Sequence, residues 1–200
     1  MDKRRLSQWM LLAVVCLSFS IGESYAQKND FGNLARYSKQ NAALPKATKK
    51  DKRVIFMGNS ITEGWVRTHP DFFKSNGYIG RGISGQTSYQ FLLRFREDVI
   101  NLTPALVVIM TSVLPAAAFK WRMEIKDVPQ KIKSLNDRIE AYAKANKIPF
   151  VNYYKAMVDE NQALNPQYTK DGVHPTGEGY DIMEPLIKRA IEKALYSLLM

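Results

Sequence analysis

The sequence contains almost no cysteine: Cys16 is the only one among 200 residues. It lies near the N-terminus, inside an apolar run that we expect to be absent from the mature protein. A mature chain without cysteine has no disulfide bond, no thiolate metal site and no cysteine nucleophile. Export remains compatible with this composition, because a domain of this length does not depend on disulfides.

Residues 1–26 have the pattern of a secretory signal peptide. Lys3-Arg4-Arg5 precede an apolar run over residues 9–19, and Ser24-Tyr25-Ala26 supplies the small residues that signal peptidase requires. The run is shorter than the roughly 20 apolar residues that a membrane span needs. We predict cleavage after Ala26, a secreted or periplasmic protein, and no stable membrane insertion after cleavage. A retained membrane anchor is the alternative.

Histidine is scarce as well, since the chain has only His69 and His174. Two distant histidines and scattered carboxylates give no metal-ligand spacing, so we predict no metal site. Residues 80–85 match the spacing of a G-x-G-x-x-G phosphate-binding turn, but no acidic residue follows about twenty residues later at a sheet edge. We interpret them as a strand end and a turn, and predict no cofactor. His69, beside Pro70 and Asp71, is expected at the surface or at a helix entry.

Acidic residues are fewer than basic ones, and the formal net charge is +10. Such an excess invites a nucleic-acid interpretation, because clustered Lys and Arg attract phosphates. The densest cluster lies in a polar connector, and no pattern of stacking aromatics accompanies it. We therefore predict a solvated linker and no nucleic-acid partner, with adhesion to an anionic surface as a weaker alternative. The cluster comprises Lys46, Lys49, Lys50, Lys52 and Arg53.

The rest of the chain alternates between segments rich in β-branched residues and amphipathic segments, which is typical of a parallel sheet covered by helices. We expect an N-terminal helix and basic linker over residues 27–53 and one α/β domain over residues 54–200. Strands are expected at 54–57, 78–83, 105–114 and 150–154, and helices at 33–43, 86–101, 127–146 and from about 178. Asn33 and Asp127 are the expected helix caps.

Helical spacing also predicts which side chains face the core. In the second helix these are Phe91, Leu92, Phe95 and Val99. In the third they are Ile132, Leu135, Ile139 and Tyr142.

Three residues in two distant segments form a candidate catalytic group. Ser60 lies in GNSITEGW, directly after the first expected strand, where Gly58 allows a sharp turn. Asp171 and His174 lie in DGVHPTGEGY. A serine hydroxyl becomes a useful nucleophile when an imidazole takes its proton and a carboxylate orients that imidazole. Taken singly, Ser60 and Asp171 are also ordinary turn residues.

These segments resemble the blocks of the SGNH, or GDSL, hydrolase family. Gly58-Asn59-Ser60 corresponds to the G-D-S of its first block, and Asp171-Gly172-Val173-His174 to the D-x-x-H of its last. ISGQTS, at residues 83–88, is similar to the second block, and Gly85 matches the glycine whose backbone N–H faces the oxyanion. The resemblance implies that Ser60 and Gly85 supply oxyanion N–H groups. From the residues alone, Gly85 is equally a turn glycine.

The family's third block, with its oxyanion asparagine, has no counterpart here. The expected strand after Pro104 continues into TSVLPAAAF, which resembles the end of the family's next strand, as though a segment had been removed near residues 109–110. The resemblance implies a three-layer α/β/α sandwich around a parallel, flavodoxin-like sheet, lacking one strand and one helix. Four strands are therefore expected. An exposed sheet face left by the missing helix would favour self-association.

The resemblance implies a serine esterase or acylhydrolase that removes acyl groups, acetyl among them, from carbohydrates or lipids through an acyl-enzyme. An exported bacterial enzyme of this kind would act on a small-molecule or glycan ester. The alternative is an inactive SGNH-like remnant that serves at most as a binding module. The rings of Trp65, Trp121 and Tyr89 could line a sugar site, but core or rim packing explains them equally well.

Overall fold

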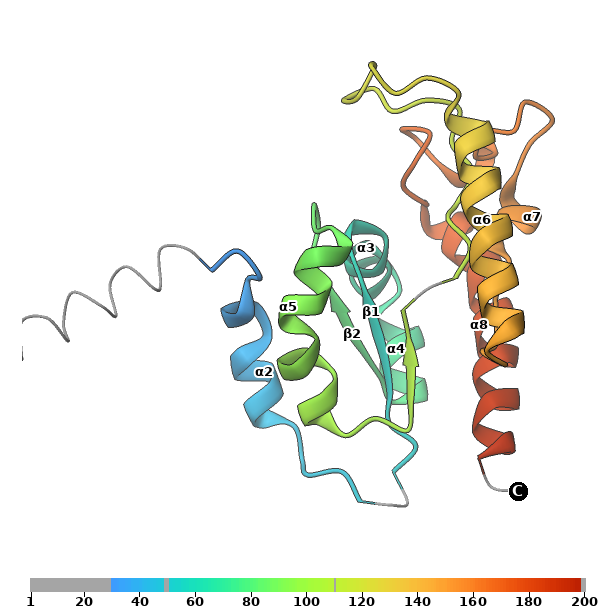
Figure 1. The fold of residues 1–200 in the computed structure, drawn as a ribbon. Coiled ribbons are helices and arrows are strands. Elements are labelled where there is room, and N and C mark those ends of the chain that lie inside the picture. Colours follow the sequence, from blue (N-terminus) through green and yellow to red (C-terminus); the bar gives the residue numbers. More distant parts are fainter. Residues whose placement is uncertain (1–29, 49–50, 110, 199–200) are drawn as a thin grey trace, which may run out of the picture.

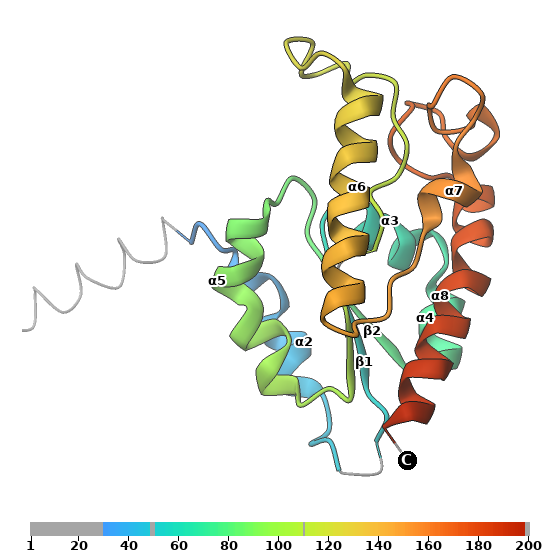
Figure 2. The same cartoon turned by 45° about the vertical axis from the view of Figure 1, so that its right-hand side comes forward.

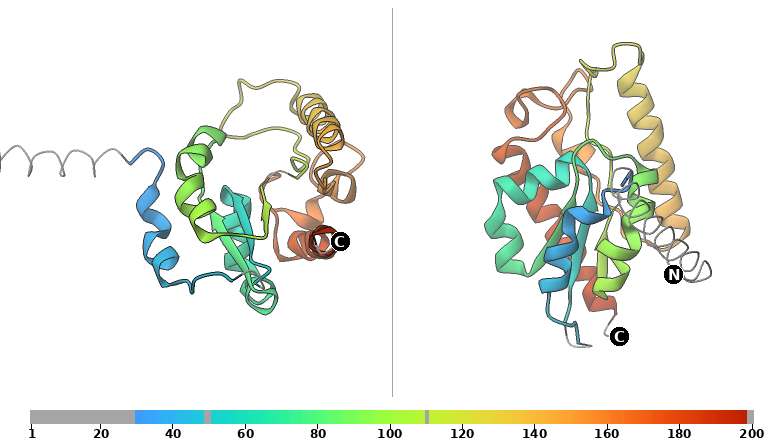
Figure 3. Two further views of the ribbon diagram at one scale, coloured as in Figure 1. Left: turned by 60° about the horizontal axis from the view of Figure 1, so that its bottom comes forward. Right: turned by 90° about the vertical axis from the view of Figure 1, so that its left-hand side faces the viewer.

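The computed structural model describes residues 30–48, 51–109 and 111–198 (Figure 1). The predicted signal peptide lies outside these residues. A parallel sheet stands at the centre, with helices packed on both of its faces (Figures 1 and 3). Within the described part of the chain no helix is both long and apolar enough to cross a membrane.

The sheet is built around β1 (Val54–Gly58), whose five residues are all buried. It pairs in parallel with β2 (Tyr78–Gly82) on one side and with β3 (Leu106–Val108) on the other. The strand order among the described residues is therefore β2-β1-β3. A central parallel strand is covered on both faces, which explains its uninterrupted apolar sequence.

Alternate residues of β1 point into two separate cores. Val54 and Phe56 join a core formed with α3 (Ser60–Thr68), α4 (Pro70–Asn76) and α8 (Gly177–Ser197). Ile55 and Met57 face α5 (Ser88–Asp98) and the 3-10 helix η2 (Ile100–Leu102) on the opposite side. The two-residue period of a strand thus produces the three predicted layers. This confirms the α/β sandwich.

Smaller elements complete the fold. The 3-10 helix η1 (Leu34–Tyr37) and α2 (Ser38–Ala43) pack near α5 (Figure 1). Towards the C-terminus follow α6 (Val128–Ala145), α7 (Tyr153–Met157) and the 3-10 helix η3 (Pro166–Tyr168).

The prediction of four strands is wrong, because the sheet has three strands among the described residues. The predicted strand at 105–114 ends at Val108. The predicted strand at 150–154 makes a single backbone hydrogen bond, from the Ser112 N–H to the Val151 carbonyl at 2.9 Å, and α7 then begins at Tyr153. Where a neighbouring strand would pair with Val113, the buried side chain of Asn136 does so instead. Its Oδ1 accepts from the Val113 N–H at 2.7 Å, and its Nδ2 donates to the Val113 carbonyl at 2.9 Å.

As a result, β3 is an edge of the sheet, and an apolar groove lies beside it. The groove has a volume of about 620 Å³ and is bordered by β3, α6, residues 148–151 and α8. Figure 2 draws the ribbons of these elements. Leu135, Tyr142 and Ile148 line it and remain 44%, 65% and 50% exposed. The helical spacing that placed Leu135 and Tyr142 on an apolar face of α6 was correct, but that face looks into the groove rather than into a closed core.

Three local predictions also need correction. Asn33 and Asp127 precede their helices with left-handed backbones, at φ 54° and 55°, and neither side chain makes a cap hydrogen bond. Leu92, predicted to be buried in α5, is 76% exposed. Arg53, assigned to the solvated linker, donates to the carbonyls of Leu102 and Pro45.

Candidate active site

Ser60 stands at the carboxyl end of β1, as the first residue of α3. Two glycines let the chain turn this tightly. A Cβ at Gly58 would lie 2.0 Å from Thr62 Oγ1, and one at Gly82 would lie 2.2 Å from the Glu63 backbone nitrogen. The start of α3 is therefore pressed against the ends of β1 and β2, which fixes the position of the Ser60 side chain.

The structure brings Ser60, His174 and Asp171 together across more than a hundred residues. Ser60 Oγ lies 2.9 Å from His174 Nε2, and His174 Nδ1 lies 2.7 Å from Asp171 Oδ2. Both links have hydrogen-bond distances. The arrangement has the geometry in which the imidazole removes the hydroxyl proton while the carboxylate fixes its tautomer.

Asp171 also organises its own loop. Its Oδ1 accepts hydrogen bonds from the backbone N–H groups of Val173 and His174, at 2.9 and 2.8 Å, and Gly172 has a left-handed backbone at φ 83°. Burial pushes the pKa of Asp171 upward, but the hydrogen bonds from His174 and Val173 outweigh it and hold the pKa well below its ordinary value. The turn role and the orienting role thus coexist, each served by a different carboxylate oxygen.

Gly85 lies in the loop that follows β2. Its backbone is left-handed at φ 77°, and no other group lies within 4 Å of the position that a Cβ would take. The turn therefore requires glycine for its conformation rather than for space. The loop is held by Glu63, whose carboxylate accepts hydrogen bonds from the backbone N–H and the hydroxyl of Ser84, and from Arg36.

The start of α3 provides a favourable place for negative charge. The N–H groups of the first helical turn lack intrahelical partners and carry the positive end of the helix dipole. The backbone N–H of Ser60 is among them, since Ser60 is the first helical residue. Gly85, on the neighbouring loop, donates no backbone hydrogen bond to any described residue. Both N–H groups are thus available for an oxyanion.

A buried polar network that the sequence did not reveal lies beneath this turn. Arg94 is completely buried and pairs with Asp98 at 2.9 Å. It also donates to the Gly58 and Arg81 carbonyls, each at 2.9 Å. The network therefore ties α5 to the ends of β1 and β2 that carry Ser60 and Gly85. The only sign of this network in the sequence is the i, i+4 spacing of Arg94 and Asp98. On most helices a pair with this spacing lies at the surface, so the spacing did not predict burial.

The aromatic residues take three different positions. Trp65 is 3% exposed and belongs to the core. Tyr89 is 77% exposed on α5. Only Trp121 reaches the site, where its ring stacks on His174 with a centroid distance of 6.1 Å and an interplanar angle of 25°. Half of Trp121 remains exposed, so it forms a wall beside the imidazole.

Two other asparagines, Asn101 and Asn136, do not replace the missing oxyanion donor. Asn136 is occupied by Val113, and Asn101 donates to Glu97 at 3.0 Å. A hollow of about 240 Å³ does open beside the turn; most of its lining side chains are apolar, and Gly58, Asn59 and Thr111 also border it. His69, the second histidine, does not enter the site and contacts α8 instead.

Comparisons with known proteins show which family this chain resembles. The model of the GDSL-like Lipase/Acylhydrolase family matches residues 111–182, which include Asp171 and His174 but not Ser60. The crystal structure of a GDSL-like lipase from Bacteroides thetaiotaomicron is 67% identical, with a TM-score of 0.80, and the match covers 82% of this chain and 99% of that one. An acylhydrolase structure from Bacteroides fragilis is 60% identical, with a TM-score of 0.80 and coverages of 82% and 98%.

More distant structures share only the fold. A lipolytic protein of the G-D-S-L family from Desulfitobacterium hafniense is 19% identical, with a TM-score of 0.56, and the match covers 70% of this chain and 99% of that one. No curated protein matches the chain.

Proposed function

The chain belongs to the GDSL-like lipase/acylhydrolase family, and from this premise we propose that it is a serine ester hydrolase working through an acyl-enzyme. The observation that carries the proposal is the continuous hydrogen-bonded path from Ser60 Oγ through His174 to Asp171. Each link joins the atoms that the chemistry requires.

The proposed reaction proceeds in two steps. Ser60 Oγ attacks the ester carbonyl while His174 Nε2 takes its proton, and the imidazolium returns that proton to the leaving alcohol. Water then attacks the acyl-enzyme with His174 again as base, which releases the acid and restores Ser60. Asp171 stays ionised throughout and stabilises the imidazolium. The N–H groups of Ser60 and Gly85 hold the negative oxygen of each tetrahedral intermediate.

We propose acyl esters of carbohydrates or lipids as substrates, with acetyl as the acyl group. The exposed ring of Trp121 beside His174 supports a substrate with a flat apolar face, as a pyranose ring has. The predicted export of the mature protein places such a glycan ester within reach. Secretion or release to the periplasm, with cleavage after Ala26, remains part of this proposal.

A second candidate function is binding without catalysis. It is favoured by one observation: the side chains of Asn101 and Asn136 are bound to Glu97 and Val113, so neither serves as the oxyanion donor that the family's third block supplies. Loss of one oxyanion donor typically lowers turnover by about 10²–10³-fold. The loss of this one donor would by itself leave a slow enzyme rather than an inert one, so ester hydrolysis remains the first proposal and binding without catalysis the second.

Hydrolysis of p-nitrophenyl acetate by the purified chain tests the proposal, with Ser60→Ala as the control. We expect the wild-type chain to release p-nitrophenol faster than Ser60→Ala, and a fluorophosphonate to label wild type but not the variant. Equal release and no labelling, in samples that unfold cooperatively, would favour the binding module instead. Aggregation or the absence of a cooperative transition would indicate that the chain does not form a stable fold.

A further inference from the structure

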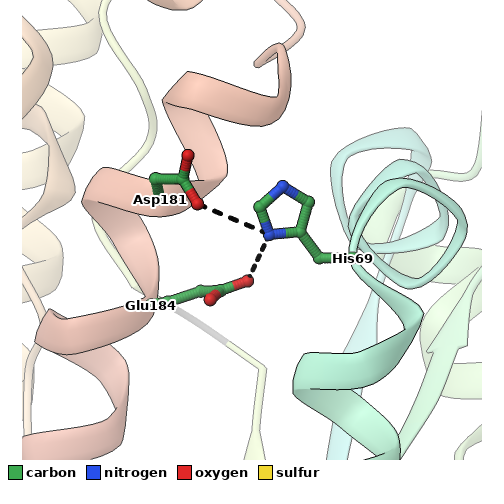
Figure 4. A group of neighbouring side chains, drawn as sticks. All are labelled: His69, Asp181 and Glu184. Atoms are coloured by element: carbon green, nitrogen blue, oxygen red, sulfur yellow. Dashed lines mark hydrogen bonds and ion pairs between the residues drawn. The ribbon is translucent and has the colours of Figure 1, made fainter.

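Outside the candidate active site, three side chains that can bind a cation converge between α3, α4 and α8 (Figure 4). His69 joins α3 to α4, and its Nδ1 lies 2.7 Å from Glu184 Oε1 and 3.8 Å from Asp181 Oδ1. All three potential ligand atoms lie within 4.8 Å of one another. Asp181 and Glu184 are three residues apart on α8, so they project from the same face of that helix.

The charge around His69 favours a cation. Among the described residues, neither Asp181 nor Glu184 forms an ion pair with Lys or Arg, although basic residues outnumber acidic ones by 29 to 19 in the chain. Glu178 precedes Asp181 by one turn of α8. Asp71 borders the same hollow of about 420 Å³ as His69 and Glu184. Several carboxylates thus gather around one imidazole in an otherwise basic protein.

The surroundings hold these side chains in place. The Trp65 indole N–H donates to Glu184 Oε1 at 3.1 Å, and the Trp65 ring is fixed in the core. The Tyr180 ring lies beside His69, with a centroid distance of 5.8 Å. Metal-binding carboxylates are commonly held by such additional hydrogen bonds. His69 and Glu184 are only about one-fifth exposed, whereas Asp181 is 68% exposed and free to rotate towards an ion.

We propose that His69, Asp181 and Glu184 form a zinc-binding site. This proposal departs from the prediction of no metal site, which rested on sequence spacing, because the three side chains come together only in the folded chain. One imidazole nitrogen and two carboxylate oxygens are common zinc ligands, and three protein ligands with a water molecule complete a tetrahedral shell. Binding requires a lone pair on His69 Nδ1. Any proton that Nδ1 shares with Glu184 must therefore move to Nε2 or pass to solvent when zinc binds.

The position of the site gives the ion a structural role. His69 directly follows α3, the helix that starts at Ser60, and Asp181 lies in the first turns of α8, which starts three residues after His174. A zinc ion would therefore cross-link the end of α3, whose first residue is Ser60, to α8, which follows the loop that carries His174. The zinc site does not depend on the proposed hydrolysis, because its ligands are separate from Ser60, Asp171 and His174.

Titration of the tag-free, chelator-treated chain with zinc chloride tests this proposal. Calorimetry is expected to show saturable binding of one ion per chain, and thermal unfolding in the presence of zinc to shift to higher temperature. Asp181→Asn should weaken zinc binding by about tenfold or more. Because Asp181 is exposed, this variant should unfold near the wild-type temperature without zinc. Glu192→Gln, another exposed carboxylate on α8, is the matched control and should bind zinc as the wild type does.

Two results would overturn the zinc site. One is the absence of saturable binding, or equal affinity in the wild type and Asp181→Asn. The other is binding that survives in Asp181→Asn but disappears in His174→Ala, which would place the ion on the candidate catalytic histidine. Fluorophosphonate labelling of Ser60, measured separately, keeps failure of the proposed hydrolysis distinct from failure of the zinc site.

Discussion

At the scale of single residues, the Asp171 side chain links the candidate chemistry to pH. Its pKa is held below the ordinary value of 3.8, although burial opposes this, because three hydrogen bonds from His174 and Val173 stabilise the carboxylate. A lowered folded-state pKa contributes stability at pH values above the ordinary one, and this contribution disappears as pH falls through the lowered value.

We therefore expect Asp171→Asn to unfold at a lower temperature than wild type near neutral pH, with the difference shrinking below about pH 4. Ester hydrolysis should fall by as much as about 10⁴-fold, because an amide no longer fixes the His174 tautomer. Thermal unfolding across a pH series and single-substrate kinetics measure the two effects. Asp159→Asn serves as the comparison, because Asp159 likewise accepts backbone hydrogen bonds in its loop but forms none with His174. A stability difference that persists unchanged in acid would contradict this account.

The buried environment of Arg94 allows a prediction of how much this residue contributes to stability. Removing one partner of a buried ion pair leaves the other without compensation and typically costs about 3–5 kcal/mol. Arg94→Met leaves Asp98 buried and also removes donors from the Gly58 and Arg81 carbonyls. We expect a loss of about that size in the free energy of unfolding, measured with urea.

The exposed pair Lys133 and Asp137 on α6 gives the matched control for Arg94. Lys133→Met removes the same kind of i, i+4 pair at the surface, and should change the free energy of unfolding far less than Arg94→Met does, because water screens exposed ion pairs. Similar losses in both variants would mean that the Arg94 network does not support the turn as described.

Sequence reasoning at this scale selected residues in compact motifs, and the fold brings Ser60 and Asp171 each within hydrogen-bond distance of His174. Ser60 follows a recognisable strand, and Asp171 and His174 are close in sequence. It missed contacts between residues that are far apart, such as His69 with Glu184, because α3 and α8 meet only after folding. It also missed the burial of Arg94, because an i, i+4 Arg–Asp pair does not show whether its helix face lies in the core or at the surface.

At the scale of elements, Gly85 in the loop after β2 has two roles that can be tested separately: its left-handed backbone shapes the turn, and its N–H is proposed to hold the oxyanion. Gly85→Ala places a side chain on a left-handed backbone with no steric neighbour, so the cost is that of the backbone alone, about 1–3 kcal/mol. If the Gly85 N–H holds the oxyanion, a shift of this loop should also reduce kcat for p-nitrophenyl acetate.

Gly77→Ala separates these two effects. Gly77 follows α4, has φ 66°, and likewise has no group within 4 Å of the position that a Cβ would occupy. We expect a comparable loss of stability with unchanged kcat. Equal loss of kcat in both variants would show that general destabilisation, and not the oxyanion contact, lowers the activity of Gly85→Ala.

The helices α5, α6 and α8 and the first two strands could be predicted from the sequence because each has a strong local pattern. The helices α3 and α4 were not predicted, and α7 begins within an expected strand. The segment after β3 could not be predicted either. Residues 105–114 are largely apolar and predict one long strand, yet pairing needs a neighbour, and Thr111 to Pro115 finds only Val151 and the Asn136 side chain among the described residues. Strand formation here depends on partners distant in sequence, which a local pattern does not contain.

At the scale of the whole molecule, the edge of β3 leaves backbone groups unpaired, and the groove beside it leaves apolar side chains exposed. Unpaired strand edges and apolar patches tend to bind other chains. The groove offers both features together, since Leu135, Tyr142 and Ile148 surround an unpaired strand edge. We propose that a second copy of the chain covers this surface, because the same edge on each copy can pair about a two-fold axis.

Sedimentation velocity over a range of protein concentrations tests this self-association. We expect a concentration-dependent dimer for the wild-type chain and a shift towards monomer for Tyr142→Lys, because a lysine ammonium in the groove would lose its hydration on association. Tyr89→Lys is the matched control: Tyr89 is similarly exposed but lies on α5, away from the groove, so its variant should dimerise as wild type does. A wild-type monomer at every concentration would show that the groove remains open to solvent. A dimer unaffected by Tyr142→Lys would place the interface on another surface of the protein.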